Sequence, residues 1–406
     1  MTRLLRHQPF KGLYLTFQLF STVLVRIPLW VALAIPPSWR PRAQWSIRRV
    51  VQLKLLRLIL AITKTTGNSK TPNHTAITPV DQADPHSPAA LWISPIPSQL
   101  VRDELAIWAT AADISPVRIP GYWLNKKGSH ITVSAPPMPG EKVVYALHGG
   151  GFRALSAHPS DPTAAIAHGL LQHVDTVQRV FSCEYRLTLA DSSGNNELPN
   201  RCFPGALIDA LAGYIYLVET VGFDPQDIIV EGDSAGGNLA LALTRYLVEH
   251  PNSGFPAPPG ALVLLSPWVN LGTPISGVRP SWINNARCDY IGPDVDIVGY
   301  LRAAGAYVGP HGLGAADINP YISSASVNPT MKVDFKGFPR TFITSGGAEV
   351  FYDMHCVLRD RMVRDLGPDM VRFHFAPHAV HDWLGLTFHE PERTEALREI
   401  AAWLTS

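Results

Sequence analysis

The sequence predicts an α/β protein with a mostly parallel central sheet, helices on both faces and a helical cap. Short apolar runs typical of buried strands alternate along the chain with longer segments of helical periodicity. Such alternation is the pattern of a parallel sheet covered by helices on both sides. In addition, the pentapeptide Gly-Asp-Ser-Ala-Gly at residues 232–236 lies between one such strand and one such helix.

The first 65 residues are predicted to form two helices ahead of this α/β unit. Gly12–Ile35 has one charge, Arg26, and is long enough to span a bilayer. Ile47–Ile62 has apolar residues at helical spacing, interrupted by basic ones, as in helices that lie on a membrane or pack on a partner. Either the first helix is a single-pass or monotopic membrane anchor and the second lies on the membrane, or both helices fold over the functional site as part of the cap. The two arrangements can coexist.

A polar stretch at residues 66–89 is expected to be a linker, and residues 90–406 a single catalytic domain. About 75 residues separate two of its strands, far more than one crossover needs, so we expect a cap insertion at about residues 266–338. The expected strands are Val143–Leu147, Val177–Ser182, Ile228–Glu231, Leu262–Leu265, Thr341–Ser345 and Val371–Phe375. The expected helices include Ala206–Glu219, Leu239–Glu249 and Thr394–Leu404.

Composition narrows the classes of partner. A net charge of +1 over 406 residues gives no support for nucleic-acid binding. The four cysteines are scattered, and neither C-x-x-C nor H-E-x-x-H occurs, so we expect no metal and no cofactor. We expect a membrane-associated protein, with the endoplasmic reticulum as one compartment and a soluble cytoplasmic protein as the alternative. The sequence leaves the oligomeric state open.

The pentapeptide has the form G-x-S-x-G, and between a strand and a helix this is a nucleophile elbow. The turn is so tight that glycine is favoured two residues before and two after the serine. Ser234 is then exposed at the start of a helix, where the helix dipole favours developing negative charge. We therefore predict Ser234 to be a nucleophile.

The segment His-Gly-Gly-Gly-Phe at residues 148–152 follows the first of the expected strands. Consecutive glycines allow backbone N–H groups to turn toward a ligand. The N–H groups of Gly149 and Gly150, with that of Ala235, are expected to form an oxyanion hole. A glycine-rich turn without a role is the alternative, and a phosphate loop is not supported because no Lys-Ser/Thr follows the glycines.

These two motifs resemble those of the hormone-sensitive-lipase group of α/β-hydrolase esterases, and the resemblance runs from about Ala90 to the C-terminus. It implies the α/β-hydrolase fold with a triad in the order serine, acid, histidine. At the substrate we expect contacts from Phe152, Trp268 and Tyr321, with internal packing of Trp268 and Tyr321 as the alternative. Further similar segments are Glu-Tyr-Arg-Leu at 184–187, Phe-Pro-Gly-Ala at 203–206, Ser-Pro-Trp-Val-Asn at 266–270 and Asn-Pro-Tyr-Ile-Ser at 319–323.

The acid and the base each have competitors. Glu349 follows a late strand, where the group places its acid, and Asp353 lies one helical turn later. We favour Glu349, with Asp353 as a helix N-terminal carboxylate. His381, in the loop after the last strand, begins a His-Asp-Trp segment similar to the group's His-x-Phe, and it is favoured over His374 and His378.

Together these residues predict a serine hydrolase that cleaves small apolar esters, with short- to medium-chain acyl or acetyl groups. In this mechanism an imidazole activates the serine and a carboxylate orients the imidazole. One alternative is an acyltransferase that uses the same triad. A second is a ligand receptor that has kept the fold without catalysis.

Overall fold

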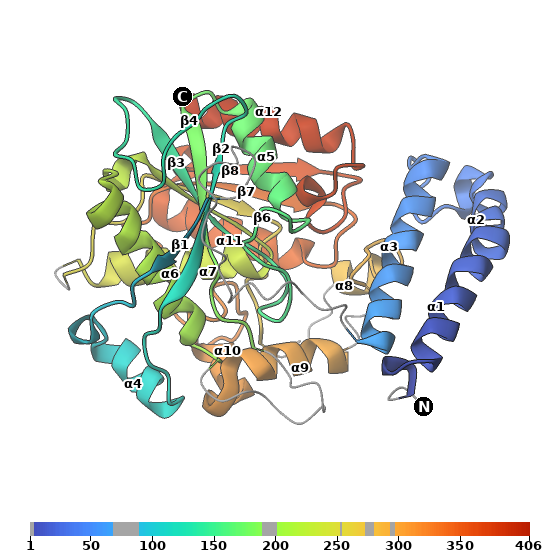
Figure 1. Ribbon diagram of the computed structural model, residues 1–406, viewed down its shortest axis with the longest axis horizontal. Helices are drawn as coiled ribbons and strands as arrows, with labels where there is room; N and C mark the ends of the chain where they lie inside the picture. Colours follow the sequence, from blue (N-terminus) through green and yellow to red (C-terminus); the bar gives the residue numbers. More distant parts are fainter. Residues whose placement is uncertain (1–3, 68–88, 189–200, 252–253, 273–279, 293–296) are drawn as a thin grey trace.

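The structure, a computed structural model, describes residues 4–67, 89–188, 201–251, 254–272, 280–292 and 297–406. One eight-stranded sheet runs through the centre of the larger unit, which begins at residue 89 (Figure 1). Its strand order is β1-β2-β4-β3-β5-β6-β7-β8. β2 is antiparallel to both β1 and β4, and every other neighbouring pair is parallel. The predicted α/β class with a mostly parallel sheet is therefore confirmed.

The six strands expected from the sequence are all present as β3 to β8, and two antiparallel strands precede them. Register pairs Val143 of β3 with Ile228 of β5, and Leu265 of β6 with Thr344 of β7, so the carboxyl ends of these strands meet at one edge. The strands are β1 (Ala89–Ile93), β2 (Ile119–Asn125), β3 (Lys142–Leu147), β4 (Val177–Cys183), β5 (Ile228–Asp233), β6 (Ala261–Leu265), β7 (Arg340–Gly346) and β8 (Val371–Ala376).

Helices cover both faces of the sheet, because side chains alternate between faces along each strand. Val143 and Tyr145 of β3 belong to the core layer completed by α6, α7 and α11, whereas Val144 belongs to the layer of α5 and α12. The predicted helix at Ala206–Glu219 is α6 continued by a π-helical turn. These helices are α5 (Ala164–His173), α6 (Gly205–Ile215), α7 (Ala235–Glu249), α11 (Tyr352–Leu366) and α12 (Glu392–Thr405); α4 (Asp103–Ala111) lies beyond the sheet.

Residues 4–67, which we call the N-terminal arm, form a helical unit at one side of the sheet (blue in Figure 1). α1 (Phe10–Ser21), a π turn and α2 (Ile27–Ala34) make one continuous helix, Phe10–Ala34. Among the described residues, it is the one helix long and apolar enough to cross a membrane. α3 (Ile47–Thr66) lies between this helix and the sheet domain. Both helices predicted for this region are confirmed.

The arm is attached to two loops of the sheet domain. Trp45, almost fully buried, donates from Nε1 to the carbonyl oxygen of His378 at 2.8 Å. Nη2 of Arg42 donates to the carbonyl oxygen of Gly347 at 2.6 Å. Trp45 also shares a small apolar cluster with Ala348 and Val380. The arm therefore holds the loops after β7 and β8.

The connection between β6 and β7 contains three helices over its described part. They are α8 (Pro280–Asn284), α9 (Ile297–Val308) and α10 (Leu313–Ile318), and α9 and α10 lie side by side at one end of the sheet domain (Figure 1). Most of the expected linker, residues 68–88, lies outside the described residues.

Candidate active site

The loop between β5 and α7 holds Ser234 in a strained backbone conformation. Its φ is 48° and its ψ is −113°, a region that residues other than glycine rarely adopt. A Cβ on Gly232 would lie 2.3 Å from the carbonyl oxygen of Gly236, and one on Gly236 would lie 1.8 Å from that of Leu147. Both glycines are therefore required by close backbone packing, and the tight turn predicted from the pentapeptide is confirmed.

Two side chains from distant loops complete a chain of hydrogen bonds at Ser234. His381, after β8, places Nε2 2.9 Å from Ser234 Oγ, so the serine hydroxyl can donate to this nitrogen. Nδ1 of His381 donates to Oε2 of Glu349, after β7, at 3.2 Å. All three side chains are buried. The structure thus brings together the three residues that the sequence singled out, in the order serine, histidine, acid through space.

The competing residues lie elsewhere. Asp353 accepts from the backbone N–H of Ser281 at 3.0 Å, in the first turn of α11, as expected for a helix N-terminal carboxylate. His374 pairs with Glu399 at 2.6 Å on the outer part of β8. The carbonyl of His378 binds the N-terminal arm.

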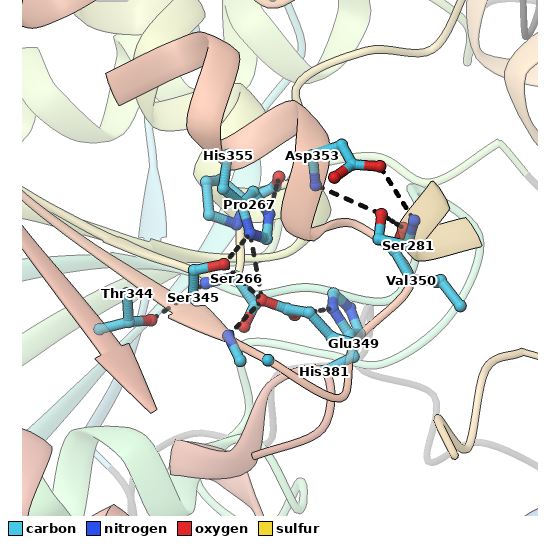
Figure 2. Close-up of polar contacts among 12 residues, drawn as sticks. Ser266, Pro267, Ser281, Thr344, Ser345, Glu349, Val350, Asp353, His355 and His381 are labelled. Carbon is cyan, nitrogen blue, oxygen red and sulfur yellow. Dashed lines mark hydrogen bonds and ion pairs between the residues drawn. The ribbon is translucent and has the colours of Figure 1, made fainter. Parts of the chain in front are cut away.

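Glu349 is surrounded by donors, as Figure 2 shows. Its Oε1 accepts from the backbone N–H of Gly346 at 2.6 Å and from the hydroxyl of Ser345 at 3.1 Å. Nδ1 of His355, on α11, lies 3.1 Å from the same oxygen. Burial opposes ionisation of Glu349, but His355 first and then His381 outweigh it and hold the pKa of this carboxyl at about 2. Glu349 is therefore a carboxylate at neutral pH.

A second carboxylate reaches His381 from its own chain neighbour. Oδ2 of Asp382 lies 2.9 Å from Nε2 of His381. Burial alone would lower the pKa of His381, but Asp382 first and then Glu349 raise it well above its ordinary value.

Burial also raises the pKa of Asp233 and Glu231 nearby, beside a cavity of about 30 Å³ that can hold about one water molecule.

The glycine loop after β3 approaches Ser234 from the other side. The N–H of Gly149 donates to Oδ1 of Asp233 at 2.9 Å, so Gly149 fastens the loop to the elbow instead of facing a substrate oxygen. This differs from the expected donor role, because the neighbouring carboxylate competes for that N–H. Gly150 and Gly151 have positive φ values of 100° and 62°. Within the described residues, nothing accepts from their N–H groups.

The three aromatic residues expected at the substrate have different positions. The hydroxyl of Tyr321 donates to Oε2 of Glu249 at 2.5 Å. Glu249 is the last residue of α7, and the rise per residue of an α-helix places it roughly 22 Å from Ser234 at the other end. The expected substrate contact of Tyr321 is therefore wrong. Phe152 is fully buried and its ring stacks on Tyr307 at 3.8 Å, so it packs internally.

Trp268 lies closer to the reacting groups. Its backbone N–H donates to the carbonyl oxygen of Ser234 at 2.8 Å. Its ring lies parallel to that of Phe351 at 6.4 Å, and Phe351 lies edge-on to His381 at 5.1 Å. Phe351, which was not among the residues expected from the sequence, therefore forms an aromatic wall beside His381.

Potential metal ligands meet at one place in the described part of the chain. Glu104, Glu249 and His250 have ligand atoms within 4.8 Å of one another. Both glutamates are exposed, and Oε2 of Glu249 already accepts the Tyr321 hydroxyl. The group lies at the end of α7 away from Ser234, so it has no part in the chemistry there.

Comparison with known proteins agrees with this architecture. A family model described as the alpha/beta hydrolase fold matches residues 143–385, more than half of the chain. A protein named esterase from Acinetobacter venetianus is 25% identical over 295 residues, which cover 72% of this chain and 82% of that protein. Esterase LipU from Mycobacterium tuberculosis is 28% identical over 273 residues, 65% of this chain and 77% of that protein. A solved hormone-sensitive lipase from a metagenome library has a similar fold, with a TM-score of 0.52 and 24% identity over 71% of this chain and 82% of its own.

Proposed function

This chain belongs to the α/β hydrolase fold family and is a hydrolase of the carboxylesterase and lipase type, and we propose that Ser234, His381 and Glu349 are its catalytic triad. The resemblance to hormone-sensitive-lipase-like esterases is confirmed by the family match and by the named relatives. The observation that supports the triad most directly is the continuous hydrogen-bonded line from Ser234 through His381 to Glu349.

The proposed reaction proceeds through an acyl-enzyme. Ser234 Oγ attacks the ester carbonyl carbon while Nε2 of His381 takes the hydroxyl proton. His381 then gives this proton to the alkoxide oxygen of the leaving alcohol, and the ester bond breaks. A water molecule, deprotonated by His381, then attacks the acyl carbon. The bond from this carbon to Ser234 Oγ breaks, Oγ takes the proton back from His381, and the acid is released. Glu349 holds Nδ1–H throughout and stabilises the imidazolium that forms.

We propose that the oxyanion is bound by the N–H groups of Gly150, Gly151 and Ala235. Ala235 begins α7, and first-turn N–H groups of a helix have no intrahelical partner. Gly149 contributes by fixing the loop to Asp233. One such donor is worth about 3 kcal/mol of transition-state stabilisation.

The substrate is proposed to be a small apolar ester with an acetyl or a short- to medium-chain acyl group. The aromatic rings of Phe351 and Tyr290 lie 5.1 and 6.1 Å from the ring of His381. Trp268 packs on Phe351. These rings offer apolar surface beside the reacting groups and few hydrogen-bonding groups, which favours an ester with apolar acyl and alcohol parts.

The test is hydrolysis of p-nitrophenyl esters from acetate to palmitate by wild type and by Ser234→Ala. We expect turnover that the substitution lowers by roughly 10⁶-fold. A fluorophosphonate should label the wild type on Ser234 and leave the variant unlabelled. Full activity in Ser234→Ala would refute the triad. A folded wild type that turns over none of these esters would favour an acyltransferase, or a receptor if labelling also fails.

We also propose that the N-terminal arm binds a membrane surface. In its long helix, Phe10–Ala34, the usual distribution of side chains is reversed. The polar side chains of Gln18 and Thr22 are buried, and Arg26 donates to both, at 2.5 and 3.0 Å. The apolar side chains point outward, including Leu13 at 66% exposure and Leu24 at 68%. Outward apolar and inward polar side chains suit a helix surrounded by lipid.

The membrane proposal predicts cosedimentation with phosphatidylcholine vesicles. Phe17→Asp, Phe20→Asp and Leu24→Asp, combined in one variant, should abolish it, because charges in the apolar region are costly. Ile107→Asp and Ile318→Asp, at exposed apolar positions outside the arm, are the matched control and should leave it intact. A wild type that stays in the supernatant would contradict the proposal.

The domain division is part of the same proposal. We propose residues 1–65 as an N-terminal segment that contains most of the arm, 66–89 as a linker, and 90–406 as the catalytic domain with a cap at about 266–338. Two observations support it: the sheet begins at Ala89, and α8, α9 and α10 all fall within the cap range. Because the arm holds the loops of Gly347 and His378, membrane contact and support of the active site can coexist.

A further inference from the structure

A second histidine lies on the far side of the triad carboxylate. His355, in the first turn and a half of α11, is completely buried. Its Nδ1 lies 3.1 Å from Glu349 Oε1 and 2.8 Å from Ser345 Oγ, and its Nε2 lies 2.9 Å from the carbonyl oxygen of Pro267 (Figure 2). Glu349 therefore lies between two imidazoles, with His381 on Oε2 and His355 on Oε1.

The partners of His355 determine where its ring carries protons. A carbonyl oxygen only accepts, so Nε2 carries a proton that it donates to Pro267. The hydroxyl of Ser345 has one proton, which it donates to Oε1 of Glu349 at 3.1 Å. Nδ1 then faces two acceptors, the Ser345 oxygen and the carboxylate, and only a proton on Nδ1 satisfies both. The arrangement thus suits a doubly protonated, positively charged ring.

We propose that His355 is a positioning residue, which holds the carboxylate of Glu349 in place for His381 and offsets part of its negative charge. The inference rests on the proposed catalytic role of Glu349 and His381. His355 touches neither the substrate nor the reacting atoms, so it acts through Glu349. A cation on Oε1 limits how strongly the carboxylate holds the proton of His381 on the other side.

The far end of the ring connects this pair to the nucleophile. Pro267, which accepts from Nε2, is followed by Trp268, whose N–H donates to the carbonyl oxygen of Ser234. His355 therefore joins the loop after β7 to the segment that supports Ser234. Without the hydrogen bonds of His355, the distance between Glu349 and Ser234 should be held less tightly. A misplacement of about 1 Å can lower the reaction rate by 10²-fold.

The charged groups that face His355 set the expected pH response. Glu349 contacts it directly, His381 lies across that carboxylate, and the charge on His355 also acts on Asp382. Replacement by a neutral side chain removes a positive charge from this group. Glu349 would then hold the His381 proton more strongly, so the acid limb of the kcat/KM profile should move to higher pH.

The test is His355→Gln, compared with His374→Gln, which changes a histidine–carboxylate pair away from the site. With p-nitrophenyl butyrate, we expect His355→Gln to lower kcat by about tenfold to a hundredfold at similar KM, and to raise the acid limb. His374→Gln should do neither. A folded His355→Gln protein with wild-type kcat and an unmoved acid limb would overturn the proposal.

Ser345→Ala is measured as well, in case His355→Gln does not fold. It removes the hydroxyl that links His355 to Glu349, and we expect a several-fold lower kcat at similar KM. An unchanged kcat in this variant would also overturn the proposal. An active Ser234→Ala, or a wild type that neither hydrolyses these esters nor is labelled by the fluorophosphonate, would refute the triad itself and is distinguishable, because neither result involves His355.

Discussion

Asp382 and His381 are chain neighbours whose side chains meet at the reacting nitrogen: Oδ2 of Asp382 lies 2.9 Å from Nε2 of His381. The same nitrogen lies 2.9 Å from Ser234 Oγ. The imidazole is thus held between Glu349 on Nδ1 and Asp382 on Nε2. Both carboxylates favour the protonated ring, but a proton on Nε2 prevents the ring from accepting the proton of Ser234.

Asp382→Asn should therefore extend activity to lower pH. His381 is a base only while Nε2 is unprotonated, so kcat/KM falls as pH falls through its pKa. Asp382 raises this pKa above its ordinary value of about 6.5. Without that charge the pKa falls, and the acid limb should move down by about one pH unit. The profile is measured between pH 5 and 9 with p-nitrophenyl butyrate.

The control for Asp382→Asn is Glu399→Gln, which removes the carboxylate partner of His374 on the outer part of β8. It should leave the profile unchanged. A limb that stays in place in Asp382→Asn, or that moves to higher pH, would show that this carboxylate does not raise the pKa of His381.

Glu349→Gln and Asp353→Asn separate the two acids that the sequence offered. Glutamine at 349 cannot hold the imidazole tautomer or stabilise its charge, so kcat should fall by about 10⁴-fold. Asp353 accepts from Ser281 and does not contact His381, so Asp353→Asn should keep kcat within about threefold of wild type. Steady-state kinetics on variants with wild-type circular dichroism provides the comparison, and the reverse ranking would move the acid to Asp353.

Gly236→Ala tests the elbow packing against a matched glycine. The added methyl would lie 1.8 Å from the carbonyl oxygen of Leu147, in rigid backbone, so we expect a loss of about 3 kcal/mol or more in the free energy of unfolding. Gly314, exposed on α10, has no atom within 4 Å of its added methyl. Gly314→Ala should stabilise by about 0.5–1 kcal/mol. Urea unfolding measures both, and equal midpoints would contradict the tight packing at Gly236.

Much of the fold could be predicted because β3 to β7 are mostly buried on both faces and contain apolar runs, whereas β8, at the sheet edge, is more exposed. β1 and β2 could not. β2 contains Pro120 and Gly121, which normally mark turns, and it forms an antiparallel strand near the sheet edge. Its partner β1 begins directly after the undescribed residues 68–88 and is only five residues long.

The site could be predicted where the chemistry imposes a sequence pattern, as at Ser234 and in the loop that carries His381. His355 gave no such signal, because a histidine within a helix is usually a packed or surface residue and its orientation toward Glu349 depends on tertiary structure. The expected role of Gly149 as an oxyanion-hole donor did not hold for a similar reason. Its N–H donates to Asp233, from a distant part of the chain, and the sequence does not reveal this contact.

The arm provides the last prediction, because it contacts the two loops that carry the acid and the base. Arg42 donates to the carbonyl oxygen of Gly347, two residues before Glu349, at 2.6 Å. Trp45 donates to the carbonyl oxygen of His378, three residues before His381, at 2.8 Å. If these contacts position the loops, then Arg42→Ala should lower kcat for a water-soluble ester by about tenfold, without change in vesicle binding.

Arg48→Ala is the matched control, since Arg48 is an exposed arginine on the same arm. It removes the same charge, so any electrostatic effect on vesicle binding should appear in both variants, whereas the fall in kcat should appear only in Arg42→Ala. Esterase kinetics without vesicles and cosedimentation with them separate the two roles of the arm. Equal kcat in both variants would mean that the arm attaches to the catalytic domain without positioning Glu349 and His381.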